Sequence, residues 1–97
     1  MSAYWIGRAQ VVDPEGFKRY GALVREAAAI YPNGVLARAG RYRVLEGPDE
    51  FERHVILRFP SMQAAEDYYH SPEYQRAAAI RRVAAGRCEI VIVEGID

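Results

Sequence analysis

The sequence contains one cysteine, no excess of charge of either sign and no long run of apolar residues. Cys88 has no second cysteine to pair with, which excludes an internal disulfide and a cysteine-based zinc site within one chain. Thirteen basic side chains balance thirteen acidic ones. Because proteins that bind nucleic acid normally carry a basic excess, we expect no nucleic-acid partner.

Metal and cofactor motifs are also missing. The two histidines, His54 and His70, are far apart in the sequence, and neither has a carboxylate at a spacing typical of metal ligands. Gly34, Gly40 and Gly47 stand at the ends of expected elements and form no phosphate-binding loop. The sequence therefore predicts neither a metal site nor a cofactor.

What is present is the composition of a single globular domain spanning residues 1–97. Hydrophobic residues make up 51% of the chain and charged residues 27%, a mixture too apolar for a disordered protein. The longest aliphatic run, residues 90–93, is far too short to cross a bilayer, so no membrane partner is expected. Residues 1–5 lack the basic stretch and apolar core of a signal peptide, which favours a cytoplasmic location.

The first half of the chain predicts a strand, a helix and a second strand. Residues 3–12 alternate between a dry face that includes Trp5 and a mixed face that includes Arg8. Asp13 and Pro14 then have the pattern of an N-cap and a first helical residue, and an apolar stripe continues to Tyr31. Residues 35–46 are expected to form a second strand, bent at Gly40.

The second half predicts a hairpin, two helical segments and a final strand. A turn at residues 47–50 precedes a third strand at residues 53–59. Ser61 and Ser71 are expected to cap consecutive helical segments, the second reaching about Ala85 with Gly86 as its C-terminal glycine. Residues 88–93 form the last strand. The order β-α-β-β-α-β predicts an α+β, ferredoxin-like domain whose four antiparallel strands carry the helices on one face.

The sheet face that lacks helices is expected to be apolar as well. In the last strand, Ile90 and Ile92 alternate with Val91 and Val93, so both faces are apolar there. An apolar sheet face of this size needs a cover, and a second copy related by a two-fold axis is the simplest one. We therefore expect a homodimer formed through the sheet face.

Several segments of the chain also resemble a known family. They are Tyr4-Trp5-Ile6, Leu36-Ala37-Arg38, Leu45-Glu46-Gly47, Phe59-Pro60-Ser61, Ser71-Pro72-Glu73-Tyr74 and Ile92-Val93-Glu94-Gly95. In this order and spacing they resemble the family called domain of unknown function 1330 (DUF1330) over nearly the whole chain. One departure is Ala39, where the family pattern has glycine beside Gly40.

The resemblance implies a dimeric α/β-barrel fold, in the broad group that includes antibiotic-biosynthesis monooxygenases and muconolactone isomerases. It implies no established reaction. Whether the chain is an enzyme is therefore left open.

The polar residues on the helix-free face are the candidate site. On the expected register this face carries Tyr4, Arg8, Gln10, His54 and Arg58, with Arg38 and Glu89 as additions. Arginine can hold a carboxylate with two hydrogen bonds, and histidine can act as an acid or base near neutral pH. The structural alternative is an ion pair of Arg8 or Arg38 with Glu89, with His54 only hydrogen-bonded.

Three functions remain open at this point. The barrel could bind a small organic acid or aromatic molecule and transform it without a cofactor, or bind it without turnover, or serve as a structural or interaction dimer. Binding predicts an enclosed cavity, whereas a structural role predicts packed side chains and closed salt bridges. His70, beside the cap at Ser71, and Cys88, on an apolar strand, are more simply explained as structural residues.

Overall fold

Strands and helices follow one another in the order that the sequence predicts. The computed structural model describes all of residues 1–97. Its elements are β1 (Ala3–Val11), α1 (Pro14–Ile30), β2 (Gly34–Arg38), β3 (Arg53–Phe59), α2 (Met62–His70), α3 (Pro72–Ala84) and β4 (Ala85–Glu94). None of the helices is long and apolar enough to cross a membrane.

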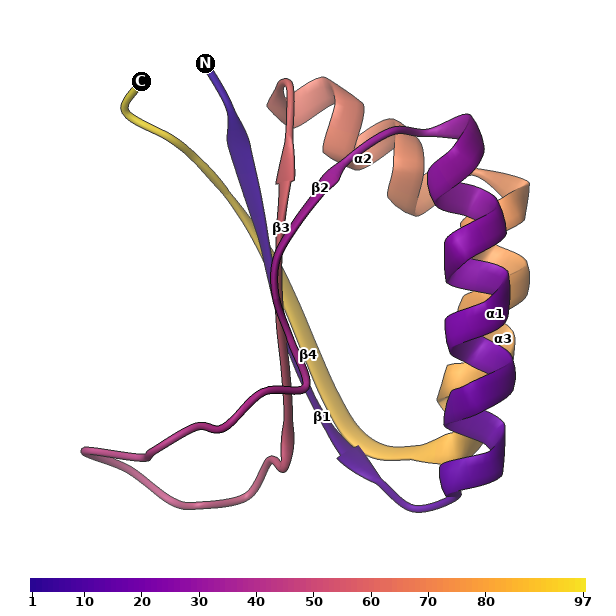
Figure 1. The fold of residues 1–97 in the computed structure, drawn as a ribbon, viewed down its shortest axis with the longest axis vertical. Helices are drawn as coiled ribbons and strands as arrows, with labels where there is room; N and C mark the ends of the chain where they lie inside the picture. Colours follow the sequence, from indigo (N-terminus) through magenta and orange to yellow (C-terminus); the bar gives the residue numbers. More distant parts are fainter.

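The four strands form one antiparallel sheet in the order β2-β3-β1-β4. Figure 1 shows all three helices on one side of this sheet, while the long loop between β2 and β3 projects from the other side. The ferredoxin-like α+β fold is thus confirmed, although within one chain the sheet is open and does not close into a barrel. We call the two sides the helix face and the open face.

The register of the strands follows the predicted alternation. Trp5 lies opposite Leu57 on β3 and Ile92 on β4, and all three side chains point to the helix face. Ile6 is paired with Ile56 and Val91 on the open face, where all three are exposed. The predicted second apolar face therefore exists.

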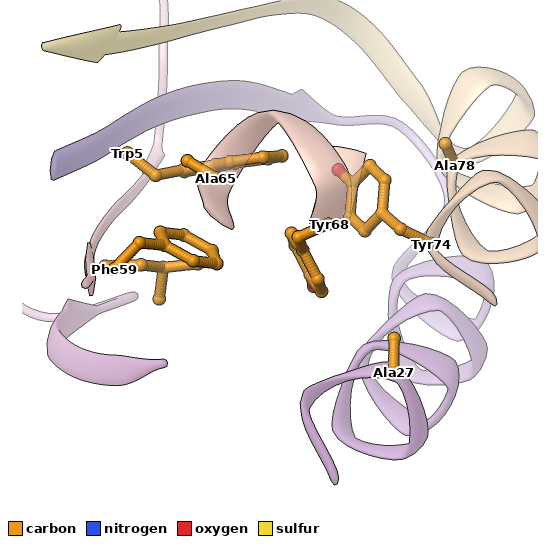
Figure 2. Packing of buried hydrophobic residues seen from close by; sticks show 8 residues of the cluster. Trp5, Ala27, Phe59, Ala65, Tyr68, Tyr74 and Ala78 are labelled. Carbon is orange, nitrogen blue, oxygen red and sulfur yellow. The ribbon is translucent and has the colours of Figure 1, made fainter. Parts of the chain in front are cut away.

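Aromatic rings fill the space between the sheet and the helices (Figure 2). The ring of Trp5 lies 5.3 Å from that of Tyr74, 5.5 Å from Tyr68 and 6.1 Å from Phe59, measured between centroids. All four side chains are buried. At roughly 1.5–3 kcal/mol for each large apolar side chain removed from water, this cluster supplies much of the force that holds the helices on the sheet.

All three predicted N-cap positions are confirmed, and two of them have a side-chain capping hydrogen bond. The hydroxyl oxygen of Ser61 accepts a hydrogen bond from the amide of Ala64 at 3.0 Å, and that of Ser71 accepts one from Tyr74 at 3.1 Å. Asp13 also stands at the predicted N-cap position, with Pro14 as the first helical residue, but its side chain makes no capping hydrogen bond and lies 3.9 Å from the guanidinium of Arg19.

Two predicted boundaries are wrong. The second strand ends at Arg38, and residues 39–52 form a loop because the backbone of Ala39 is left-handed, with φ at 51°, which diverts the chain out of the sheet. Gly86 is not a helix-terminal glycine: α3 ends at Ala84 and passes directly into β4, in which Gly86 lies against the side chain of Gln10.

Ala39 occupies a left-handed backbone conformation that favours glycine. A side chain with a Cβ is strained in this conformation, whereas glycine is not. Ala39→Gly relieves this strain in the folded state but also gives the unfolded chain more conformational entropy. We expect the net effect to be a rise of about 0.5–1 kcal/mol in the free energy of unfolding. Urea unfolding measures this change. Ala37→Gly, in a regular strand, is the control and should lower stability; an equal loss for both variants would show that Ala39 is unstrained.

The contact between α1 and α3 depends on a glycine for a different reason. A Cβ at Gly16 would lie 2.6 Å from the Cβ of Ala84, closer than two carbon atoms can approach. We expect Gly16→Ala to lower the free energy of unfolding by about 1–3 kcal/mol. Gly21→Ala in the same helix is the control, since its Cβ meets only a side-chain nitrogen of Arg25 at 3.7 Å, and it should raise stability by about 0.5–1 kcal/mol. Similar effects of the two variants would contradict a close approach at Gly16.

Candidate functional site

Most residues of the predicted site lie together on the open face. Arg8 on β1 is paired with His54 on β3 and with Glu89 on β4. Tyr4, which precedes Arg8 on β1 and lies on the same face, is paired with Arg58. The sequence alternation therefore placed these five residues on the correct side of the sheet.

The arginine at the centre of this group is already paired. The Nε and Nη2 atoms of Arg8 donate to one oxygen of Glu89 at 3.0 and 2.8 Å, and Arg87 donates to the other oxygen at 2.9 Å. Hydrogen bonds from Arg8 hold the pKa of the Glu89 carboxyl below its usual range. Phe51, from the loop after β2, covers the pair, with the guanidinium carbon of Arg8 4.4 Å from the ring centre. The structural alternative of an Arg8–Glu89 ion pair is confirmed.

Arg58 has partners near the chain termini. Its Nε donates to the hydroxyl of Ser2 at 2.9 Å, and its Nη2 lies 3.3 Å from the carboxylate of Asp97. Asp97 also accepts hydrogen bonds from the amide and hydroxyl of Ser2, which lower the pKa of its carboxyl. This cluster joins the two ends of the chain, which lie side by side in Figure 1.

His54 is enclosed by the loop that follows β2. Its ring centre lies 4.6 Å from that of Tyr42, and its Nδ1 atom is buried without a hydrogen-bond partner. The expectation that His54 is merely hydrogen-bonded is therefore not met at this nitrogen. A role of His54 as an acid or base remains a prediction.

The predicted position of Arg38 on the open face is wrong. A register shift between Val35 and Ala37 turns the end of β2 over, and Arg38 is paired with Val55, whose side chain lies on the helix face. Arg38 consequently lies beside Arg53, at the edge of the space between the sheet and α1. A bulge of this kind moves a side chain to the other face without any signal in the hydrophobic pattern.

A cavity lies between the helix face of the sheet and helices α2 and α3. It has a volume of about 320 Å³, within the range of small-molecule sites. We call it the interlayer pocket. Its apolar walls are Trp5 and Tyr69 with Ile90 and Ile92, and its polar lining consists of Glu66, His70, Arg81 and Cys88.

Arg81 is the unusual member of this lining. Only 7% of the residue is exposed, yet no carboxylate lies within 4.0 Å of its guanidinium. Its Nη1 atom donates to the hydroxyl of Tyr74 at 2.7 Å, and that hydroxyl is 3.0 Å from the hydroxyl of Tyr20. The Nε atom is buried without any partner. The result is a buried cation with no acidic partner and one donor atom left unpaired.

The other ionisable groups of the pocket leave this positive charge uncompensated. Burial raises the pKa of the Cys88 thiol, so the thiol is neutral at physiological pH and supplies no counter-ion. Burial likewise raises the pKa of the Tyr74 phenol, which therefore stays protonated beside Arg81. Glu66 and His70 are exposed at the solvent end of the pocket, four residues apart on α2. The pocket therefore combines an inner cation with an outer acid and imidazole.

Sequence reasoning missed this site, although one signal was present. Tyr74, Ala77, Ala78 and Arg81 follow helical spacing along the buried side of α3. An arginine on an otherwise buried stripe is unusual, because arginine is almost never fully buried without a partner. The position of Arg81 near the C-terminal end of α3, where the helix dipole favours a cation, offers a simpler explanation and hides this signal.

Structures with this fold come from proteins of differing description. A protein of unknown function from Rhodopseudomonas palustris has a TM-score of 0.81 and 18% identity, covering 99% of this chain and 83% of its own. A dimeric ferredoxin-like protein of unknown function from Jannaschia sp. CCS1 has a TM-score of 0.74 and 17% identity, covering 98% and 100%. Hydroxynitrile lyase from Passiflora edulis has a TM-score of 0.68 and 14% identity, covering 95% and 91%. At these identities the likeness concerns the fold alone.

The sequence itself matches a family. No curated protein matches the chain. The family model described as a domain of unknown function, DUF1330, matches residues 2–96, which is nearly the whole chain and agrees with the resemblance of its segments. The chain belongs to the DUF1330 family.

Proposed function

We propose that this protein binds a small organic acid with an aromatic or otherwise apolar body in the interlayer pocket. The burial of Arg81 without a counter-ion is the observation that supports an acid. A buried, unpaired charge costs several kcal/mol, and an anion bound against it offsets that cost. Hydrogen bonds to a charged group contribute about 1.5–3 kcal/mol, enough to select a carboxylate over its neutral analogue.

The walls of the pocket fit the apolar part of such a ligand. Trp5 and Tyr69 present aromatic surface, with ring centres 5.9 Å apart, and Ile90 and Ile92 line the sheet side. A volume of about 320 Å³ suits a compact molecule of about one ring rather than a large cofactor. The proposed activity is binding, and no chemical step is included in it.

The interlayer pocket supports this activity better than the open face does. On the open face, the charge of Arg8 is already compensated by Glu89, which accepts from its Nε and Nη2 atoms and would compete with a ligand carboxylate. In the interlayer pocket, Arg81 has no carboxylate within 4.0 Å that a ligand would have to compete with. A role for Tyr4, Arg8, Arg38, His54, Arg58 and Glu89 in ligand binding stays a prediction.

Substitution of Arg81 separates a binding role from a structural one. We expect benzoate to change the fluorescence of Trp5, the single tryptophan of the chain, in a saturable way, and benzamide to bind at least tenfold more weakly. Arg81→Met should weaken benzoate binding more than tenfold while leaving the free energy of unfolding unchanged or higher, because an apolar side chain replaces an unpaired buried charge.

The control is Arg76→Met, which removes an exposed arginine of the same helix that lines none of the principal cavities and should change neither quantity. Equal binding of benzoate by the native protein and by Arg81→Met would refute the proposal. A large loss of stability in Arg81→Met would instead assign this arginine a structural role.

We further propose that two copies of the chain associate through the open face. Ile6, Ile56, Val91 and Val93 are all exposed there, over adjacent strands. A second copy is the occupant that fits, because the apolar centre is flanked by side chains of both signs and two-fold symmetry brings acidic and basic groups of the two copies together. Several proteins with this fold are described as dimeric.

Sedimentation measures this association directly. We expect the native protein at micromolar concentration to have twice the 11.0 kDa mass of the chain. Val91→Glu places a charge in the apolar centre of the open face and should give monomers. Val83→Glu changes an exposed valine on the outer side of α3 and should leave the dimer intact. A native protein that sediments as a stable monomer, or equal dissociation by both variants, would contradict this interface.

A further inference from the structure

A second, smaller hollow opens on the other side of Trp5 from the interlayer pocket. It lies between α1 and the edge formed by β2 and β3, and its volume is about 70 Å³. We call it the arginine cleft, because Arg25 from α1, Arg38 from β2 and Arg53 from β3 converge on it. Tyr68, from α2, contributes to its inner wall.

The three arginines of this cleft have no acidic partner. No carboxylate lies within 4.0 Å of any of them, whereas Arg8, Arg58 and Arg87 on the open face are all in ion pairs. Arg53 is held in place by Phe17, with its guanidinium carbon 5.5 Å from the ring centre. Burial, with a smaller contribution from the charge of Arg38, lowers the pKa of Arg53, as expected for two nearby cations without an anion between them.

A hydrogen-bond donor without a partner lies on the inner wall of the same cleft. Tyr68 is 0% exposed, and its hydroxyl makes no hydrogen bond. Burial raises the pKa of this phenol well above its ordinary value, so the hydroxyl keeps its proton and can donate it in a hydrogen bond. A buried hydroxyl without a partner costs about 1–3 kcal/mol, which a bound acceptor would recover.

We propose that the arginine cleft is a second anion-binding site, which takes a carboxylate or phosphate group between Arg38 and Arg53 with the hydroxyl of Tyr68 as a third donor. The small volume admits an oxyanion head group and no ring, so the rest of a larger ligand extends toward the exposed Arg25. Guanidinium groups suit this task, because their planar donors match the oxygen spacing of carboxylates and phosphates.

This site and the interlayer pocket share the wall residue Trp5 but have different charged residues. The arginine cleft does not include Arg81, and the interlayer pocket includes none of the three arginines of the cleft. Substitution of these arginines can therefore test the two sites separately.

Chemical-shift titration of the amide resonances tests this site with two probes, inorganic phosphate and acetate. We expect saturable shifts around Arg53 and Tyr68 below about 10 mM for at least one probe, and the stronger probe identifies the head group. Arg53→Gln should weaken binding about tenfold, and Tyr68→Phe, which removes only the hydroxyl, several-fold. Arg38→Gln changes an exposed side chain and gives the same test without disturbing the core.

Arg76→Gln is the matched control, since it removes the same charge from an exposed position outside the cleft and should leave binding unchanged. Arg81→Met should also leave it unchanged, which distinguishes this site from the interlayer pocket. The inference is overturned if neither probe gives saturable shifts, or if Arg76→Gln weakens binding as much as Arg38→Gln and Arg53→Gln do.

Discussion

The packing of Trp5 against the helix layer is the interaction on which the rest of the structure depends. Its indole contacts rings from β3, α2 and α3 at once, and so fixes the distance between the sheet and the helices. Several of the rings packed around Trp5 are tyrosines, so hydroxyl groups are buried in an otherwise apolar core. Tyr74 finds partners in Tyr20 and Arg81, whereas Tyr68 finds none. The two hollows on either side of Trp5 are therefore consequences of how the core is packed.

The arginines on the two sides of the sheet differ in whether they are paired with acids. On the open face, Arg8, Arg58 and Arg87 are paired with carboxylates, so the charges on this surface nearly cancel. On the helix face, Arg81 is buried and Arg53 half-buried, and neither has an acidic partner. A balanced surface suits self-association, whereas an unpaired buried cation suits the binding of an anion. This difference between the two faces supports a dimer formed through the open faces, with the ligand sites on the helix side of each sheet.

The sequence could predict the fold because its signals are local and repeated. Alternation in β1 and β4, together with the serine caps at Ser61 and Ser71, sets the element types and their order. The candidate site was less accessible. Alternation placed Arg8 and Glu89 together, but nothing in the sequence showed that they were already paired with each other. The misplacement of Arg38 has a single cause, a shift of register next to a left-handed residue that happens to be alanine.

By itself the sequence determined the order of the elements, the two apolar faces of the sheet and the family. These features depend on hydrophobic periods of two and 3.6 residues and on short capping motifs, which all involve residues close together in the sequence. Only the tertiary structure decided which charges are paired. Arg8 and Glu89 meet across adjacent strands, while Arg81 is brought over β4 with no acid beside it. Pairing depends on distances of a few ångströms between residues remote in the chain, and hydrophobic periodicity carries no information about such distances.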